Sequence, residues 1–270
     1  MQERNENFPN GVEAFLLFVA LFVAEYVVGL AMFDLRGVHG MDLKDVDGLV
    51  ALVGNGIIFT FVMEYKKLTY RELFHSSAAS KTATILLLGP LIVLIVPLIC
   101  LLLGTAIEWL VRVFPLSNWE QAAFARMGSG SFASVVMVCI LAPVLEEMFF
   151  RGIILRSFLR QYPKWTAIVG SATLFGFAHM NLYQFVAAFS IGLFLGWLYE
   201  RTRSLLPCIW LHAVYNSGWV LAAANDDLHT KTAGASDVSG ILWAGALLLG
   251  TAGSLALHRV LVGRAGRRKP

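Results

Sequence analysis

The chain alternates between long apolar runs and short polar connections. Eight runs approach the roughly 20 mostly apolar residues that a helix needs to cross a bilayer. They are Gly11–Met32, Val46–Glu64, Ala83–Trp109, Phe132–Leu155, Trp165–His179, Tyr183–Tyr199, Leu205–Ala224 and Val238–Leu261. The pattern therefore predicts an all-α membrane protein, a polytopic bundle of about eight transmembrane helices.

Three of these runs have unusual features. The third is long and contains Pro90 and Pro97, so we expect it to be kinked or strongly tilted. The fifth and sixth are short and are joined by a tight link, Met180–Leu182, which predicts a helical hairpin buried among the other helices. The first run is longer than the apolar core of a signal peptide, so we interpret it as a retained helix.

Basic residues predict how the bundle is oriented. If the N-terminus is cytoplasmic, 15 of the 21 Lys and Arg residues fall on that side, five fall outside and Arg151 lies within a helix. This bias favours an even number of spans with both termini in the cytoplasm. The basic tail Arg264–Pro270 is then expected to rest on anionic lipid headgroups.

Composition narrows the class of protein further. Hydrophobic residues make up 57% of the chain, charged residues only 14%, and the mean hydropathy is +0.69. A net charge of +3 is too small to suggest a nucleic-acid partner. Cys100, Cys139 and Cys208 lie in apolar runs without CxxC spacing, so we interpret them as packing residues. The chain is expected to be a multi-pass membrane protein, in the cell membrane if it is prokaryotic.

Polar residues recur inside the apolar runs, where they are costly and usually mark function or pair with each other. Those that stand out are Glu146, Glu147, Arg151, His179, His212 and Asn216. Residues four apart share a helix face, so Glu147 can pair with Arg151 and His212 with Asn216. Glu146 points about 100° away from Glu147 and faces another neighbour.

Counting residues from the basic loops places these groups at similar depths. With a rise of ~1.5 Å per residue, Glu146 lies ~15 Å, His179 ~22 Å and His212 ~14 Å from the cytoplasmic edge. All fall near the middle of a hydrocarbon layer of ~30 Å. Three helices are therefore expected to bring polar groups to one level.

The residue types fit hydrolysis. A desolvated glutamate can act as a general base on water, a histidine can share its proton or bind a metal, and His with Asn can stabilise an oxyanion. Each element also has a structural interpretation that stays open. Glu147–Arg151 can be an ion pair, His179 an interfacial histidine, and His212 with Asn216 an interhelical hydrogen-bonding pair.

At these residues the sequence resembles the CAAX-protease and bacteriocin-processing (CPBP) intramembrane proteases, which include the type II CAAX prenyl endopeptidases. The family pattern of EExxxR, FxxxH and HxxxN is matched in order. The matching positions are Glu146, Glu147 and Arg151, then Phe175 and His179, then His212 and Asn216. The resemblance implies a catalytic core at 131–225, preceded by transmembrane helices in 1–130 and followed by a helix and basic tail in 226–270.

The resemblance also implies roles for these residues. Glu146 with His179 would activate the attacking water, His212 and Asn216 would stabilise the oxyanion, and Glu147 with Arg151 would shape the site. Phe175 is interpreted as packing. Glu146, His179 and His212 could bind Zn²⁺ with one position left for water, and a metal-free glutamate mechanism is the alternative. HExxH is absent, so the sequence gives no independent zinc signature.

The implied function is an intramembrane endopeptidase acting on membrane-associated substrates, among them prenylated CAAX-type proteins or peptide precursors. We expect substrates to enter from the cytoplasmic leaflet. The alternatives are a non-catalytic membrane scaffold and a proton- or cation-coupled transporter. Glu25 and Asn55 have no assigned role; a partner within the bundle is the preferred interpretation of Glu25, and a substrate contact the other. Pro143, one turn before Glu146, either kinks the helix or is simply tolerated.

Overall fold

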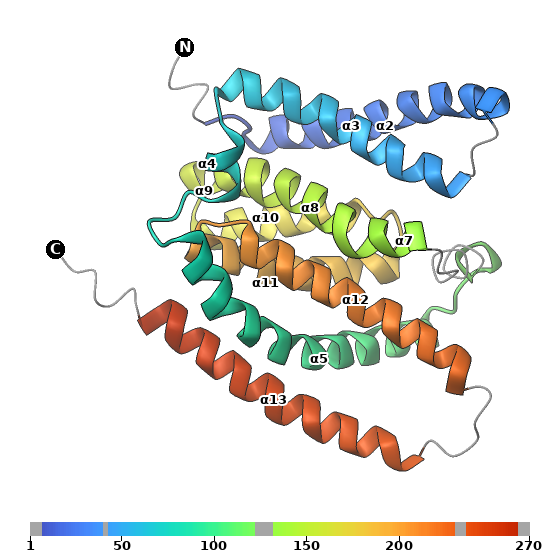
Figure 1. Cartoon of the computed structure of the whole chain (residues 1–270), viewed down its shortest axis with the longest axis vertical. Coiled ribbons are helices and arrows are strands. Elements are labelled where there is room, and N and C mark those ends of the chain that lie inside the picture. Colours follow the sequence, from blue (N-terminus) through green and yellow to red (C-terminus); the bar gives the residue numbers. More distant parts are fainter. Residues whose placement is uncertain (1–6, 40–42, 122–131, 230–235, 264–270) are drawn as a thin grey trace. The chain divides into compact units, whose positions relative to one another are not determined.

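The computed structural model of the chain describes residues 7–39, 43–121, 132–229 and 236–263 (Figure 1). Every regular element named in this part of the chain is a helix. In order they are α2 (Gly11–His39), α3 (Leu43–Lys66), α4 (Tyr70–Phe74), α5 (Lys81–Val113), α7 (Phe132–Val136), η1 (Met137–Leu141), α8 (Ala142–Glu147), η2 (Met148–Leu155), α9 (Arg156–Gln161), α10 (Lys164–Phe177), α11 (Leu182–Thr202), α12 (Leu206–His229) and α13 (Ser236–Gly263).

The polytopic all-α prediction is confirmed, because a helix forms in each of the eight apolar runs. Within the described residues, six helices are long and apolar enough to cross a membrane. These are the helices that contain 11–33, 48–66, 81–113, 132–161, 182–202 and 240–263. With 14 residues, α10 extends only ~21 Å, less than the ~30 Å of a hydrocarbon layer. The chain is an integral multi-pass membrane protein, and the count of eight spans and the cytoplasmic termini stay predictions.

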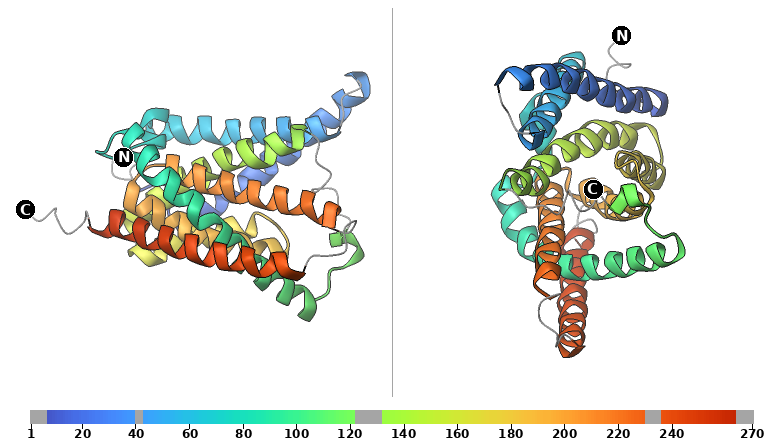
Figure 2. Two further views of the ribbon diagram at one scale, coloured as in Figure 1. Left: turned by 60° about the horizontal axis from the view of Figure 1, so that its bottom comes forward. Right: turned by 90° about the vertical axis from the view of Figure 1, so that its right-hand side faces the viewer.

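The chain forms two compact units. The first consists of Met1–Ser76 and Leu141–Glu200, and it contains α2–α4 and the helices from α8 to α11. Within it α2 lies along α3, and α10 packs on η2 and α9 (Figure 2). Gly196 of α11 permits close packing on α10, since a Cβ there would lie 2.9 Å from the Ile168 side chain. A larger residue at position 196 would force the two helices apart.

The second unit consists of Ser77–Ile140 and Arg201–Pro270. Here α5 lies beside both α12 and α13, and Figure 1 shows α5 curving between its ends, as Pro90 and Pro97 within the helix predict. Gly250 of α13 faces Leu98 so closely that a Cβ would lie 2.4 Å from the leucine Cβ. Small residues at such contacts are typical of helix packing in membranes.

The run from 132 to 161 is helical throughout, but two stretches of it are π-helical. They are η1 and η2, on either side of the short α8 that carries both glutamates of the motif. Pro143 lies in the first turn of α8, directly after η1. A π-helical stretch has wider turns than an α-helix, and such stretches occur frequently at functional sites. Hydrophobic periodicity did not predict either of them.

Polar contacts hold the ends of the first unit's helices. Thr69 and Glu72 form a capping box at the start of α4, and the carbonyl of Glu72 accepts a 2.7 Å hydrogen bond from Arg156. The hydrogen bonds from the Thr69 backbone and hydroxyl lower the pKa of Glu72 below its ordinary value. Before α2, the carbonyl of Pro9 accepts a 3.0 Å bond from Gln161. These contacts tie α4 and the start of α2 to α9.

Candidate active site

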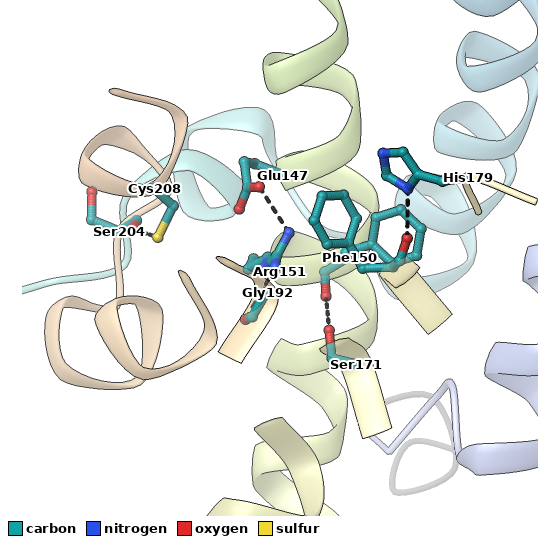
Figure 3. A network of polar contacts seen from close by, with 9 residues as sticks. Glu147, Phe150, Arg151, Ser171, His179, Gly192, Ser204 and Cys208 are labelled. Carbon is teal, nitrogen blue, oxygen red and sulfur yellow. Dashed lines mark hydrogen bonds and ion pairs between the residues drawn. The ribbon is translucent and has the colours of Figure 1, made fainter. Parts of the chain in front are cut away.

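The side chains of Glu147 and Arg151 form the buried centre of the site. Arg151 Nη1 donates a 2.8 Å hydrogen bond to Glu147 Oε1, and both side chains are completely buried (Figure 3). The predicted pairing at a separation of four residues is therefore confirmed, although η2 begins between the two residues. An ion pair without access to solvent is strongly destabilised when one partner is removed.

Arg151 also joins η2 to two neighbouring helices. Its Nη2 donates a 3.2 Å hydrogen bond to the carbonyl of Gly192 in α11, and its guanidinium lies over the ring of Phe175 in α10, 4.4 Å from the ring centre. Gly192 allows this approach because a Cβ there would lie 3.2 Å from the Phe175 ring. The arginine is thus held by a carboxylate, a carbonyl and an aromatic face.

Phe175 connects the ion pair to His179. The phenylalanine is buried, and its ring contacts the imidazole of His179 edge-on, with 5.3 Å between the ring centres. Phe150 of η2 packs against another part of the same ring at 5.1 Å. The packing role predicted for Phe175 is confirmed, and the structure adds a cation–π contact that the sequence did not reveal.

Two contacts orient His179, which lies just after the end of α10. Its Nδ1 is 3.1 Å from the carbonyl oxygen of Phe175; because a carbonyl can only accept, Nδ1 carries the proton. The Nε2 atom is then the nitrogen that can accept a proton or bind a metal. Asn181 Nδ2 donates a 2.8 Å bond to the carbonyl of His179, and Asn181 also caps α11 through its side chain. Met180, between them, has a positive φ of 54°, which reverses the chain.

A hydrogen bond between α10 and η2 keeps these helices in register. Ser171 Oγ donates to the carbonyl of Phe150 at 3.0 Å, and Ser171 is buried (Figure 3). The carbonyl belongs to a π-helical stretch, whose hydrogen bonds are less regular than those of an α-helix. Ser171 was not predicted as a site residue, since a serine in an apolar helix has no distinguishing sequence signal.

Glu146 has surroundings different from those of its neighbour. Its side chain is half-buried in the first unit, whereas Glu147 is fully buried, as expected for two residues about 100° apart on a helix. The carboxyl group of Glu146 interacts electrostatically with Glu25 of α2. Asn55 of α3 donates a 3.0 Å hydrogen bond to Glu25 Oε1. The expected partner of Glu25 within the bundle is therefore Asn55, a residue 30 positions away.

His212 and Asn216 lie one turn apart on α12, in the second unit. His212 is buried, and Asn216 Nδ2 donates a 2.9 Å hydrogen bond to the carbonyl of Val138 in η1. Their predicted place on one helix is confirmed and their pairing stays a prediction, while the interhelical bond of Asn216 matches the structural interpretation of this residue. Their role as an oxyanion site with the residues of the first unit stays a prediction.

The proposed zinc ligands are also divided between the two compact units. Glu146 and His179 belong to the first unit and His212 to the second. Among the described residues, no group of three or more His, Cys, Asp or Glu side chains is placed to hold a metal ion. His179 does fit a ligand role, because metal-binding histidines usually donate their other ring N–H to a carbonyl or carboxylate. Zinc binding by these three residues stays a prediction.

Comparison with known proteins confirms the resemblance over part of the chain. Residues 128–218 match the family model "Type II CAAX prenyl endopeptidase Rce1-like". A Bacillus subtilis protein named "Putative membrane peptidase YdiL" is 28% identical over 83 residues, which cover 31% of this chain. The aligned part spans about a third of that relative (34%). No solved structure matches the chain at a comparable level. Every motif position from Glu146 to Asn216 lies within the matched segment.

Proposed function

Because residues 128–218 are Rce1-like, we propose that the protein is an intramembrane endopeptidase that hydrolyses peptide bonds of membrane-associated substrates. Glu146 is the general base: it takes a proton from water, and the resulting hydroxide attacks the carbonyl carbon of the peptide. His179, whose Nδ1 is bound to a carbonyl, shares this proton through Nε2, and the proton then passes to the leaving amine. His212 and Asn216 stabilise the oxyanion.

The observation that carries this proposal is the buried chain from Glu147 through Arg151 and Phe175 to His179. A desolvated ion pair is costly within a membrane protein, and it contributes little stability compared with apolar packing. The ion pair adjoins Glu146 in sequence, and Arg151 contacts Phe175, the ring that packs against His179. We infer that the pair holds the catalytic groups in a fixed orientation. Pre-organisation of this kind is what a hydrolytic site requires.

The resemblance to the family supports a proposal for the substrates. Prenylated CAAX-type proteins and peptide precursors are the proposed classes, and they reach the site from the bilayer. If Zn²⁺ is bound, Glu146, His179 and His212 would hold it, and the ion would supply Lewis acidity. Glu146 would then be a metal ligand, and the role of general base described above belongs to the metal-free case.

The test uses the purified full chain in liposomes, with two quenched-fluorescent apolar peptides, one carrying a farnesylated CAAX end and one without a prenyl group. We expect the wild type to cleave at least one of them, and Glu146→Gln to reduce kcat/KM by ~10²-fold or more. Glu64→Gln serves as the matched control, because Glu64 is an exposed glutamate of α3 paired with Lys67.

Incubation with a chelator separates the two chemical routes. Loss of cleavage that is restored by Zn²⁺ supports metal binding, and unchanged cleavage supports the glutamate mechanism. Equal activity of the wild type and Glu146→Gln would rule out the proposed role of Glu146. A wild type that cleaves neither peptide would favour the scaffold interpretation.

A further inference from the structure

Two polar residues near the middle of α2 and α3 form a pair that the proposed mechanism does not use. Asn55 Nδ2 donates to Glu25 Oε1 at 3.0 Å and also contacts the carbonyl of Ala51 at 2.9 Å. Asn55 is buried and Glu25 is half-buried. Glu25 lies ~21 Å along α2 from Gly11, well inside the apolar stretch of that helix. A carboxyl group at such a position is costly and usually serves a function.

Gly54 explains why the pair can form. A Cβ at Gly54 would lie 2.6 Å from Cγ of Glu25 and 3.2 Å from its Cα. Only a glycine therefore lets α3 approach α2 this closely at the level of Glu25. The next residue, Asn55, is brought within hydrogen-bonding distance by that approach. The local sequence of α3 is thus suited to fix the Glu25 side chain in one orientation.

The Glu25 carboxyl group also interacts electrostatically with Glu146. Both belong to the first compact unit, Glu25 on α2 and Glu146 on α8. Two carboxyl groups that interact in this way supply several hydrogen-bond acceptors to this part of the unit. Buried acceptors of this kind favour a partner that supplies hydrogen-bond donors, because apolar neighbours would leave them unsatisfied.

A peptide that is cut within a membrane supplies such donors. The scissile segment must leave its helical conformation, because the carbonyl that is attacked is otherwise enclosed in the helix. Unwinding exposes main-chain N–H groups, and at membrane depth these groups must find acceptors within the protein. A carboxyl oxygen can accept more than one hydrogen bond, so the bond from Asn55 leaves capacity on Glu25.

We propose that Glu25, held by Asn55, is a substrate-binding residue that accepts a hydrogen bond from a main-chain N–H next to the scissile bond. This inference rests on the proposed protease function and adds the α2–α3 pair to a site otherwise confined to the family segment. Asn55 then positions the Glu25 side chain, and Gly54 permits the close approach of α3 to α2 that this requires. The recognised feature is the backbone of an extended peptide, so recognition at this point is independent of side-chain sequence.

The experiment measures KM and kcat separately for wild type, Glu25→Gln and the control Glu64→Gln, with the fluorescent peptides described above. The peptides are also made with the amide bonds flanking the scissile bond replaced by esters, one at a time. In Glu25→Gln the amide oxygen can still accept from Asn55, but the NH₂ group then faces the substrate donor. We expect KM to rise ~10-fold with kcat changed by less than ~3-fold, and Glu64→Gln to match the wild type.

Ester replacement gives the decisive comparison. At one flanking position it removes the N–H that Glu25 binds, so we expect the wild type to lose ~10-fold in kcat/KM and Glu25→Gln to lose little more. Binding can be measured without cleavage in the Glu146→Gln variant. We expect the double variant Glu25→Gln with Glu146→Gln to bind the intact peptide with a ~10-fold higher Kd than Glu146→Gln alone.

The outcomes separate the inference from the function on which it rests. A wild type that cleaves neither peptide would overturn the proposed function and this inference with it. If the wild type cleaves but Glu25→Gln leaves KM, Kd and the ester effect unchanged, the inference alone is overturned. It is also overturned if Glu25→Gln lowers kcat and the melting temperature with no change in KM, because Glu25 would then be purely structural.

Discussion

The guanidinium of Arg151 lies 4.4 Å from the centre of the Phe175 ring, and the edge of that ring meets the imidazole of His179. A phenylalanine thus links the buried ion pair to the histidine proposed to share the proton. Cation–π contacts are strongest when the cation is removed from water, as it is here. The position of His179 therefore depends on packing around Arg151, although no hydrogen bond between the two residues is described.

Replacing Phe175 should test this link. We expect Phe175→Leu to lower kcat by ~10-fold, because a contact worth ~1–2 kcal/mol that orients His179 is lost while the apolar volume is largely kept. The measurement is the steady-state rate in liposomes, beside the melting temperature. Phe18→Leu is the control, since this buried ring packs edge-on against Phe22 of the same helix, α2. An unchanged kcat for Phe175→Leu would show that the ring does not position His179.

Removal of one charge of the buried pair should be severe. We expect Arg151→Met to destabilise the protein by ~3–5 kcal/mol, since it leaves Glu147 buried without its cation. Thermal unfolding in detergent measures the effect. The double variant Glu147→Gln with Arg151→Met should recover part of this stability, because no unpaired charge remains.

The surface pair Glu64–Lys67 provides the comparison. Lys67→Met should change stability by less than ~1 kcal/mol, because this ion pair is exposed to solvent. If Arg151→Met and Lys67→Met have similar effects, the burial of the Arg151 pair has no energetic consequence and its assignment as the centre of the site is wrong.

The buried ion pair could be predicted from the sequence because it depends only on local spacing. Glu147 and Arg151 are one turn apart, so the helix itself brings them together whatever the surrounding fold. The order of EExxxR, FxxxH and HxxxN supplied the remaining candidates. The aromatic link through Phe175 was missed because a phenylalanine in an apolar helix looks the same whether it packs against a leucine or a guanidinium.

Asn181, which is half-buried in the turn between α10 and α11, should matter for both stability and catalysis. Its side chain holds the carbonyl of His179 and caps the start of α11, so Asn181→Ala removes both contacts at once. We expect a stability loss of ~0.5–2 kcal/mol and a fall in kcat, measured by thermal unfolding and cleavage. Asn181→Asp can still cap α11 but cannot donate to the His179 carbonyl. Recovery of stability without recovery of kcat in this variant would assign the functional role to the bonds that Asn181 Nδ2 donates, to the His179 carbonyl and to Gln184 Oε1.

The capping box of α4 gives a pH-dependent prediction. Glu72 has a lowered pKa in the folded protein, so its carboxylate stabilises the fold above its unfolded pKa and loses this effect as the pH falls through the lowered value. Thr69→Ala removes the hydroxyl bond to Glu72, one of the two hydrogen bonds that cause the shift, and keeps the bond from the backbone N–H. We expect a melting temperature ~1–3 °C lower at pH 7, and a smaller difference from wild type at pH 3.

Thr105→Ala is the matched control for this variant, because the Thr105 hydroxyl bonds to Leu101 within its own helix and caps nothing. Its difference from wild type should not vary with pH. A difference between Thr69→Ala and wild type that stays constant from pH 7 to pH 3 would contradict the assigned role of Glu72.

Contacts between residues far apart in the chain could not be predicted from the sequence. Asn55 and Glu25 are 30 residues apart on different helices, and nothing in either apolar run specifies which residue faces which. Gly54 is the one local sign of a close approach, and it becomes informative only once α2 is known to lie opposite. The two π-helical stretches were equally hidden, because hydropathy reports apolar positions and not the number of residues in a turn.

The π-helical turns of η2 change where the proposed base lies relative to the lipid. Eight of the residues between Glu146 and Arg156 belong to η2, and each contributes less axial rise than a residue of an α-helix, since the turn is wider. The ~15 Å obtained from an α-helical count is therefore too long. If Arg156 and Arg160 mark the edge of the bilayer, as predicted, Glu146 lies nearer the headgroups and their hydration than that count gives. Hydrolysis consumes one water molecule per bond, and a shallower base has a shorter path to its supply.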